Sequence, residues 1–237
     1  EGHAGSAFFI GSGACGVHGL VQMDGRLYSL SSGPVGAGEA VLATDASALP
    51  PSNWMCGADE RGHPARPAGD APATQSLVDG SCRRMLVAIE GDREFTAKWP
   101  GNPAAAAAYA GILNAGAAFI YQRDFNLVPS ISYLRVWEVE DPWTIDHICD
   151  GDDQLSQFAD YWLNNMGHVD RASAHLLSGR WLGGGCAYVG WACGGGGYAV
   201  SQVDGFFPYP VVDHSWSNWD LSVYTHEFGH NLNCLHT

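Results

Sequence analysis

Positively charged side chains are scarce in this sequence of 237 residues. Only 11 Lys and Arg stand against 25 Asp and Glu, which gives a formal net charge of −14 at neutral pH. Nucleic acids and anionic membrane surfaces are bound through clustered positive charge. The charge balance therefore argues against both classes of partner.

The sequence also lacks a long, strongly hydrophobic run. Its longest apolar stretch, residues 103–121, consists mostly of Ala and Gly and includes Asn114. A membrane-spanning helix needs about 20 consecutive, predominantly apolar residues. We therefore expect no membrane span here. The first residue is Glu1, with no basic and apolar leader before it, so we expect any secretion signal to have been removed or left out.

Cysteine and glycine, in contrast, are abundant. Seven cysteines indicate an oxidising compartment, although metal ligation explains cysteines equally well. Because seven is odd, at least one thiol has no partner within the chain. The 31 glycines occur with nine Trp and nine Phe, which favours many turns in a packed domain over disorder. We expect a secreted, extracellular protein.

A proline-rich stretch divides the chain. Residues 1–50 contain short apolar runs and turns, with a hairpin signal at Asp24-Gly25. Residues 58–75 carry three prolines and almost no apolar side chain, which is typical of a linker. We therefore predict two regions, 1–80 and 81–237.

Strands and helices alternate in the second region. The patterns predict strands at 85–95, 130–139, 172–179, 185–193 and 197–203, and helices at 102–122, 152–166 and from Ser217 onward. Asn102-Pro103 is a helix start, and Ser217 with Asp220 resembles a capping box. This alternation is typical of an α/β fold. The glycine clusters at 183–185 and 194–197 do not lie between a strand and a following helix, so they predict no nucleotide site.

The last twelve residues, "HEFGHNLNCLHT", carry the chemistry. His226 and His230 are four residues apart, so on a helix both rings reach one ion. Glu227 follows the first of them and is placed to act as a general base toward a metal-bound water. An apolar stripe that includes Leu221 and Phe228 lies on the opposite side of the predicted helix. The pattern predicts zinc ligands that face a cleft.

A third histidine strengthens this prediction. His236 lies six residues past His230, so a continuous helix would point it away from the ion. The chain must leave the helix in between, and Asn233 is the residue that tolerates the left-handed conformation needed there. A surface helix with incidental histidines is the alternative, and it explains this spacing poorly.

The stretch 226–236 resembles the extended zinc signature of the metzincin peptidases, H-E-x-x-H-x-x-G-x-x-H, with Asn233 in place of the usual Gly. Within that clan the adamalysin (reprolysin, ADAM-like) branch is the most similar. The stretch 174–193 is similar to the part of that branch that leads from a core strand to the upper rim of the cleft. The segments 86–95 and 15–30 are similar to its first strand and to part of its propeptide.

The resemblance implies a metzincin-like α/β catalytic domain, a twisted mixed sheet of five strands with two long helices, the second of which carries the zinc, after a mainly β propeptide region. It implies a secreted zinc endopeptidase proenzyme, with His226, His230 and His236 on the metal and Glu227 as general base. The partner would be a protein or peptide substrate. Its backbone would pair with an upper-rim strand at about 186–193, through Ala187, Tyr188, Val189 and Gly190. A zinc-binding module that does not cleave is the alternative.

Two departures from the family stand out. The chain stops one residue after His236, so it lacks the methionine-containing turn and the lower part of the cleft, and the zinc-bearing part is expected to be truncated. Thr237 stands where adamalysins usually carry Asp.

The resemblance also assigns an inhibitory role to a cysteine. Met55-Cys56-Gly57 is similar to the propeptide segment whose cysteine binds the zinc and displaces the water, and an ordinary disulfide at Cys56 is the alternative. For the remaining cysteines we predict a Cys186–Cys193 pair and, as a weaker hypothesis, Cys82 with Cys149. Cys234 has no assigned partner.

Other polar residues predict no second site. The remaining histidines lack ligand spacing, and no calcium site is predicted. Asp213-His214 is tempting as a proton-relay pair, but such dipeptides are usually polar groups of a loop. Arg83-Arg84 resembles a processing site, although a polar lead into the first strand of the second region explains it better.

Overall fold

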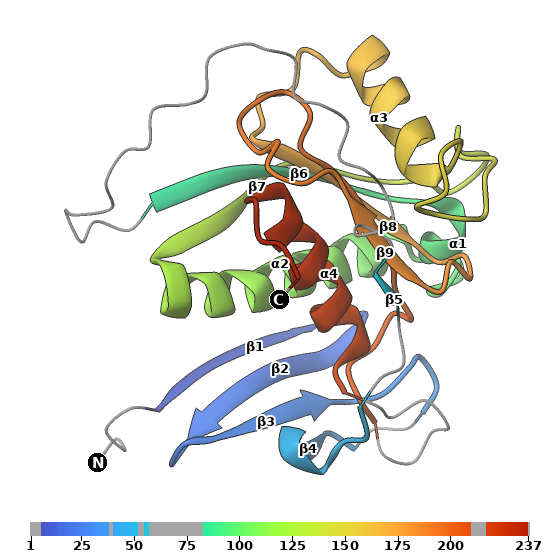
Figure 1. Cartoon of the computed structure of the whole chain (residues 1–237). Helices are drawn as coiled ribbons and strands as arrows, with labels where there is room; N and C mark the ends of the chain where they lie inside the picture. Colours follow the sequence, from blue (N-terminus) through green and yellow to red (C-terminus); the bar gives the residue numbers. More distant parts are fainter. Residues whose placement is uncertain (1–5, 38–39, 52–54, 57–82, 210–216, 237) are drawn as a thin grey trace.

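A computed structural model of the chain describes residues 6–37, 40–51, 55–56, 83–209 and 217–236 (Figure 1). The predicted linker, Cys82 and the Asp213-His214 pair lie outside these residues. The described strands are β1 (Ala7–Gly13), β2 (Gly16–Met23), β3 (Arg26–Ser31), β4 (Leu42–Asp45), β5 (Met55–Cys56), β6 (Arg83–Gly91), β7 (Leu127–Val136), β8 (Ser173–Ser178), β9 (Gly184–Ala187) and β10 (Tyr198–Gln202). The helices are α1 (Arg93–Thr96), α2 (Pro103–Phe125), α3 (Gln154–Asn165) and α4 (Trp219–Asn231), with a 3-10 turn η1 (Ala46–Ala48).

The N-terminal region forms a 4-stranded antiparallel sheet in the order β1-β2-β3-β4. Asp24 and Gly25 join β2 to β3 with positive φ angles of 52° and 76°. Positive φ at both central residues matches the right-handed twist of the two strands, which is why Asp-Gly is a favoured hairpin turn. The predicted hairpin is confirmed.

The second sheet is 6-stranded, in the order β5-β9-β10-β8-β6-β7. Strands β7, β6, β8 and β10 run parallel, whereas β9 is antiparallel to β10. The five strands β6 to β10 come from the second region and match the number that the resemblance implied. The sixth, β5, comes from the N-terminal region and adds to the edge beside β9.

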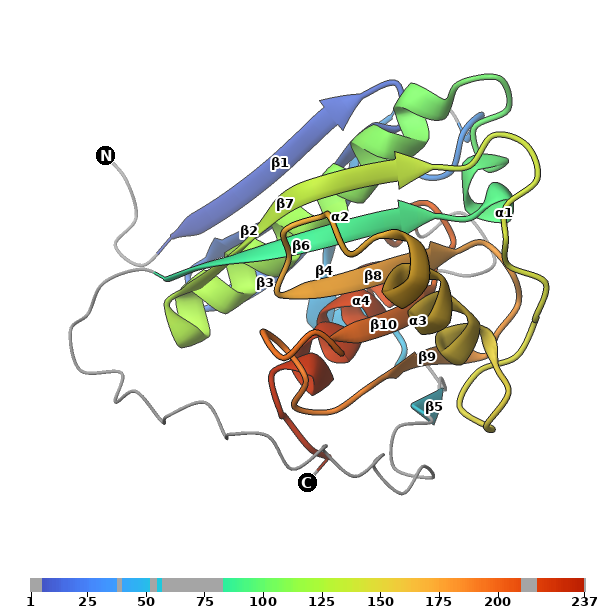
Figure 2. The same cartoon turned by 90° about the horizontal axis from the view of Figure 1, so that it is seen from above.

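The two sheets enclose a helical layer. Helices α2 and α4 lie between them, and α3 covers the opposite face of the larger sheet (Figures 1 and 2). Residues of β2, β6, α2 and α4 share one hydrophobic core, which includes Leu20, Val87, Leu113 and Phe228. Helix α4, which bears His226 and His230, therefore packs between the two sheets.

Helix α2 begins as the sequence predicts and ends three residues past the predicted Gln122, at Phe125. Asn102 caps it by accepting a hydrogen bond from the Ala105 amide, Pro103 occupies the first turn, and Asn126 ends it with a φ of 53°. Among the described helices α2 alone is long and apolar enough to cross a membrane, and 56% of its most apolar window is buried inside the fold. Its place between the sheets makes it a core helix of this structure.

The N-cap of helix α4 lies one residue later than predicted. Its N-cap is Asn218, whose Oδ1 accepts a hydrogen bond from the Leu221 amide, so the predicted capping box of Ser217 and Asp220 is wrong. Asp220 is instead buried and accepts hydrogen bonds from the Tyr109 hydroxyl and from the amides of 204 and 205. Because α3 intervenes, α4 is also the third of the longer helices and not the second of two.

The disulfide prediction is wrong. Cys186 is bonded to Cys149, with a Cα–Cα distance of 5.8 Å, and not to Cys193. Side chains alternate along a strand, and Cys186 points to the face of the sheet that α3 covers, where Cys149 also lies. Cys193 is an exposed free cysteine in the turn after β9. The same bond excludes the pairing of Cys149 with Cys82.

Candidate metal centre

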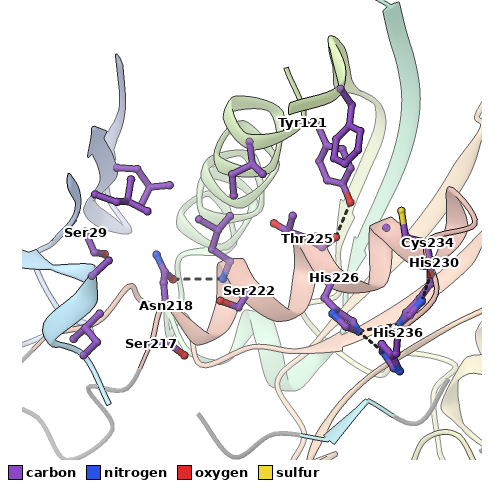
Figure 3. Close-up of a pocket in the computed structure, with 18 of the residues that line it drawn as sticks. Ser29, Tyr121, Ser217, Asn218, Ser222, Thr225, His226, His230, Cys234 and His236 are labelled. Atoms are coloured by element: carbon purple, nitrogen blue, oxygen red, sulfur yellow. Dashed lines mark hydrogen bonds between the residues drawn. The ribbon is translucent and has the colours of Figure 1, made fainter. Parts of the chain in front are cut away.

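The histidines of α4 converge as their spacing predicts. His226 and His230 lie one turn apart, with their Nε2 atoms separated by 2.9 Å. Asn233 has a φ of 74°, which confirms the predicted left-handed turn out of the helix. This turn brings His236 back, so that its Nε2 atom lies 2.9 Å from that of His226 (Figure 3).

A thiol from the N-terminal region completes the group. Cys56 Sγ lies 3.2 Å from His230 Nε2. The four potential ligand atoms, one thiol sulfur and three imidazole nitrogens, all lie within 4.8 Å of one another. The structure thus brings together all four residues that are predicted to bind metal, with Cys56 lying 170 or more positions away from the histidines in the chain.

One backbone contact sets the tautomer of His230. Its Nδ1 atom lies 2.7 Å from the carbonyl oxygen of Cys234. Because a carbonyl oxygen can only accept, Nδ1 carries the proton and donates this hydrogen bond. The Nε2 atom then presents a lone pair to the neighbouring rings. An outer hydrogen bond of this kind orients metal-binding histidines in proteins.

The donor set fits a metal ion. Nitrogen lone pairs that face each other at 2.9 Å repel unless a proton or a cation lies between them. Imidazole nitrogens and a thiolate are the ligands that suit zinc, and four of them match its preferred coordination number. His226, His230, His236 and Cys56 would hold such an ion.

Glu227 lies next to this group and is completely buried. Burial raises the pKa of its carboxyl well above the ordinary value, while the nearby Cys56 side chain lowers the pKa by a smaller amount. Apart from that thiol, neither carboxylate oxygen has a hydrogen-bond partner among the described residues. A buried acceptor without a donor is costly to a fold, and such groups are typical of functional sites.

The predicted upper-rim strand is displaced toward the N-terminus. Strand β9 spans Gly184–Ala187, so that of the four residues given a substrate-pairing role only Ala187 lies in it. Tyr188 follows the strand, and Val189 and Gly190 form a turn. Strand β5 pairs with the start of β9, with Met55 opposite Gly184 and Cys56 opposite Gly185. Sequence analysis missed this pairing, because a strand of two residues leaves no periodic signal.

A cavity of about 580 Å³ adjoins the histidines (Figure 3). It lies between the N-terminal sheet, the end of α2 and the exposed side of α4. Its wall is largely apolar and includes Leu20, Leu27, Ile120, Leu221 and Leu235. The metal centre therefore opens onto an apolar hollow and not onto a charged surface.

Comparison with known proteins identifies the family. A model of metallopeptidase family M12 matches residues 81–237, which include His226, Glu227, His230 and His236. The chain belongs to metallopeptidase family M12. Cys56 and the N-terminal sheet precede the part that matches the M12 model. No curated protein matches the sequence.

Two solved structures are similar to this M12 chain. One is the crystal structure of metalloproteinase-II from Bacteroides fragilis, with 12% identity and a TM-score of 0.49 over 100% of this chain and 71% of that chain. The other is a structure of a chaperone–substrate complex, with 10% identity and a TM-score of 0.48 over 98% of this chain. The chain spans 30% of the length of that second protein.

Proposed function

We propose that this chain is the zinc-bearing part of a secreted endopeptidase of the adamalysin-like branch, held latent by its own N-terminal region. The observation that carries the proposal is the convergence of three imidazole nitrogens and the Cys56 thiol beside a buried glutamate. The substrates would be proteins or peptides, as expected of a peptidase family.

In this proposal the three histidines bind the metal, and Glu227 acts as the base. His226 and His230, with His236 from the turn after the helix, would hold the zinc, which would supply Lewis acidity toward the scissile carbonyl and the attacking water. Glu227 takes the proton of that water and passes it to the leaving amine, because the helix places its carboxylate next to the first ligand. Its burial keeps bulk water away from the carboxylate.

Latency would come from two contacts of the N-terminal region. Cys56 is tethered to the same chain, so its effective concentration at the metal is high and it occupies the position that the reactive water needs. Strand β5 pairs with the edge of β9, where an extended substrate would add as a further strand. Of the two contacts, the thiol blocks the chemistry, whereas the strand of two residues competes with the peptide for the edge of β9.

Secretion is supported by the cysteines. The Cys149–Cys186 bond joins the loop before α3 to the edge strand, and structural disulfides persist mainly in oxidising compartments. We therefore propose that the protein acts outside the cell.

The test uses the full chain, loaded with zinc, and a set of fluorogenic peptides. Cys56→Ala should cleave faster than the parent, because the fourth position at the metal becomes accessible. In that background, Glu227→Gln should keep one zinc per chain and lose roughly 10²- to 10⁴-fold in rate. Glu138→Gln, at an exposed position remote from the metal centre, is the matched control and should cleave at the Cys56→Ala rate.

Two outcomes would contradict the proposal. Equal rates for Glu227→Gln and its parent would remove Glu227 as the base. Zinc binding without any cleavage by Cys56→Ala would favour the zinc-binding module that does not cleave.

A further inference from the structure

The carboxyl end of α4 is attached to the turn that follows β9. The last carbonyl groups of a helix have no partner within the helix and need donors from elsewhere. Here the amide of Gly190 donates to the carbonyl of His230 at 2.8 Å, and the amide of Ala192 donates to that of Asn231 at 2.9 Å. The turn after β9 thus caps the helix at His230, one of the predicted metal ligands, and at Asn231.

The side chain of Asn231 adds a second attachment. It is fully buried, and its Nδ2 atom donates to two backbone carbonyls, that of Tyr188 at 2.9 Å and that of Tyr198 at 3.0 Å. Tyr188 directly follows β9, and Tyr198 begins β10. One amide group therefore ties the helix to both strands of the hairpin.

The amide nitrogen matches both partners at this position. Both partners are carbonyl oxygens, and an amide nitrogen has two N–H groups with which to satisfy them. A carboxylate of the same shape would place negative charge against two acceptors in a buried site, which is strongly unfavourable. The Oδ1 atom of Asn231 has no hydrogen-bond partner among the described residues, so the two donated bonds account for its polar contacts.

We propose that Asn231 is a positioning residue that fixes His230 relative to the edge strand, so that metal ligand and substrate-binding edge form one rigid unit. The inference rests on the proposed function in one respect, since it assumes that His230 binds zinc. His230 precedes Asn231 in sequence, and the amide of Asn231 binds the residue that directly follows β9, the strand on which Gly185 contacts Glu227. A shift of the helix end would change the ligand and the base together.

The test compares Asn231→Asp with the parent in two measurements. The first is amide hydrogen exchange at Gly190 and Ala192 with the metal removed, where the variant should exchange at least 10-fold faster. The second is zinc affinity by competition with a chromophoric chelator, where the variant should bind about 10- to 100-fold more weakly, as for other groups that orient ligands. Cobalt substitution adds a readout, since a displaced His230 changes the visible spectrum.

The matched control is Asn164→Asp. The Asn164 side chain also donates to a backbone carbonyl near a helix end, that of Asp160 at 2.8 Å, but it is exposed and lies on α3. It should leave both measurements at the parent values. If Asn231→Asp does not fold, Gly190→Ala provides a second route. The φ of Gly190 is +76°, and an added Cβ would come within 2.7 Å of Asn233 Oδ1, so this change should loosen the same helix end.

The outcomes separate the two proposals. Parent-like exchange and zinc affinity in Asn231→Asp would overturn the positioning role, and so would faster exchange with unchanged affinity. A parent chain that binds no zinc would refute the metal centre. The exchange measurement would then still decide whether Asn231 holds the helix end.

Discussion

The side chain of Glu227 lies against the bare backbone of Gly185. A methyl group at residue 185 would come within 2.5 Å of Glu227 Cγ and 2.6 Å of its Oε1. Gly185 is the residue of β9 that pairs with Cys56 in β5, so the absence of a side chain there lets the carboxylate reach the sheet edge beside the thiol.

Gly185→Ala should therefore displace the carboxylate of Glu227 without removing a metal ligand. We expect zinc content to stay at the parent value, while peptide cleavage in the Cys56→Ala background falls about 100-fold, since small misplacements of a catalytic group have effects of this size. Gly167→Ala is the control, because an added Cβ there meets no atom within 4 Å. Equal cleavage by the two variants would show that the close contact does not position Glu227.

Zinc should stabilise the folded chain. A ligand that binds only the native state adds about 2.7 kcal/mol at 100 times its Kd, so the melting temperature should rise with zinc and fall with a chelator. His236→Ala removes one of the converging nitrogen atoms and should lose most of this response. His168→Ala, at an exposed position on no helix or strand, should keep the response. Calorimetry or circular dichroism would measure the shift, and a full response in His236→Ala would exclude it as a ligand.

The disulfide should matter more than the free thiols. Cys149 and Cys186 are 37 residues apart, and closing a loop of that length is worth about 4 kcal/mol in the chain-entropy description. Cys149→Ser should lower the free energy of unfolding by about that amount in non-reducing denaturant titrations. Cys193→Ser, at an exposed free cysteine, should change it little. Coincident titrations for both variants would show that the bond does not stabilise the fold.

Acid should loosen the contact between the N-terminal sheet and the helical layer. His18 is buried on β2, donates from Nε2 to the Cys15 carbonyl and accepts at Nδ1 from the Phe207 amide. Burial lowers its pKa to about 4, whereas an unfolded histidine titrates near 6.5.

The sign follows from these two pKa values. Between pH 6.5 and 4 the unfolded chain binds the extra proton, so the contribution of His18 is fully present above pH 6.5 and is lost as the pH falls toward 4. The loss amounts to about 3 kcal/mol. Denaturation between pH 4 and 7 should show a shallower pH dependence for His18→Gln than for the parent, and His168→Gln should follow the parent. A parallel pH dependence in all three would mean that His18 is not buried as a neutral ring.

The sequence predicts the structure correctly where neighbouring residues alone determine the backbone conformation. Asn102-Pro103 starts α2, and Asp24-Gly25 turns the hairpin, because each needs only neighbouring residues. The left-handed Asn233 could be predicted because such a turn returns His236 to the other two histidines.

The predictions are wrong where segments distant in the sequence determine a residue's contacts. The short separation in sequence predicts a bond between Cys186 and Cys193. The pleat of β9, however, turns the Cys186 side chain to the face of the sheet that α3 covers, where Cys149 lies. Asp220 was given a capping role that Asn218 takes, because the Tyr109 hydroxyl and two amides from another segment bind that carboxylate. The edge pairing of β5 has no sequence signal of its own.

The N-terminal sheet shares a hydrophobic core with α2 and α4, and this core affects how fast the two regions can separate. Leu20 of the N-terminal sheet is buried in the same cluster as Leu113 and Phe228, so that sheet is attached by packing as well as by the peptide chain. A single cut between residues 56 and 83 would leave the two pieces associated. In the proposed proenzyme, the delay between cutting and activity would then be set by the lifetime of a non-covalent complex, and mild denaturants or acid would shorten it without any change in the rate of cutting.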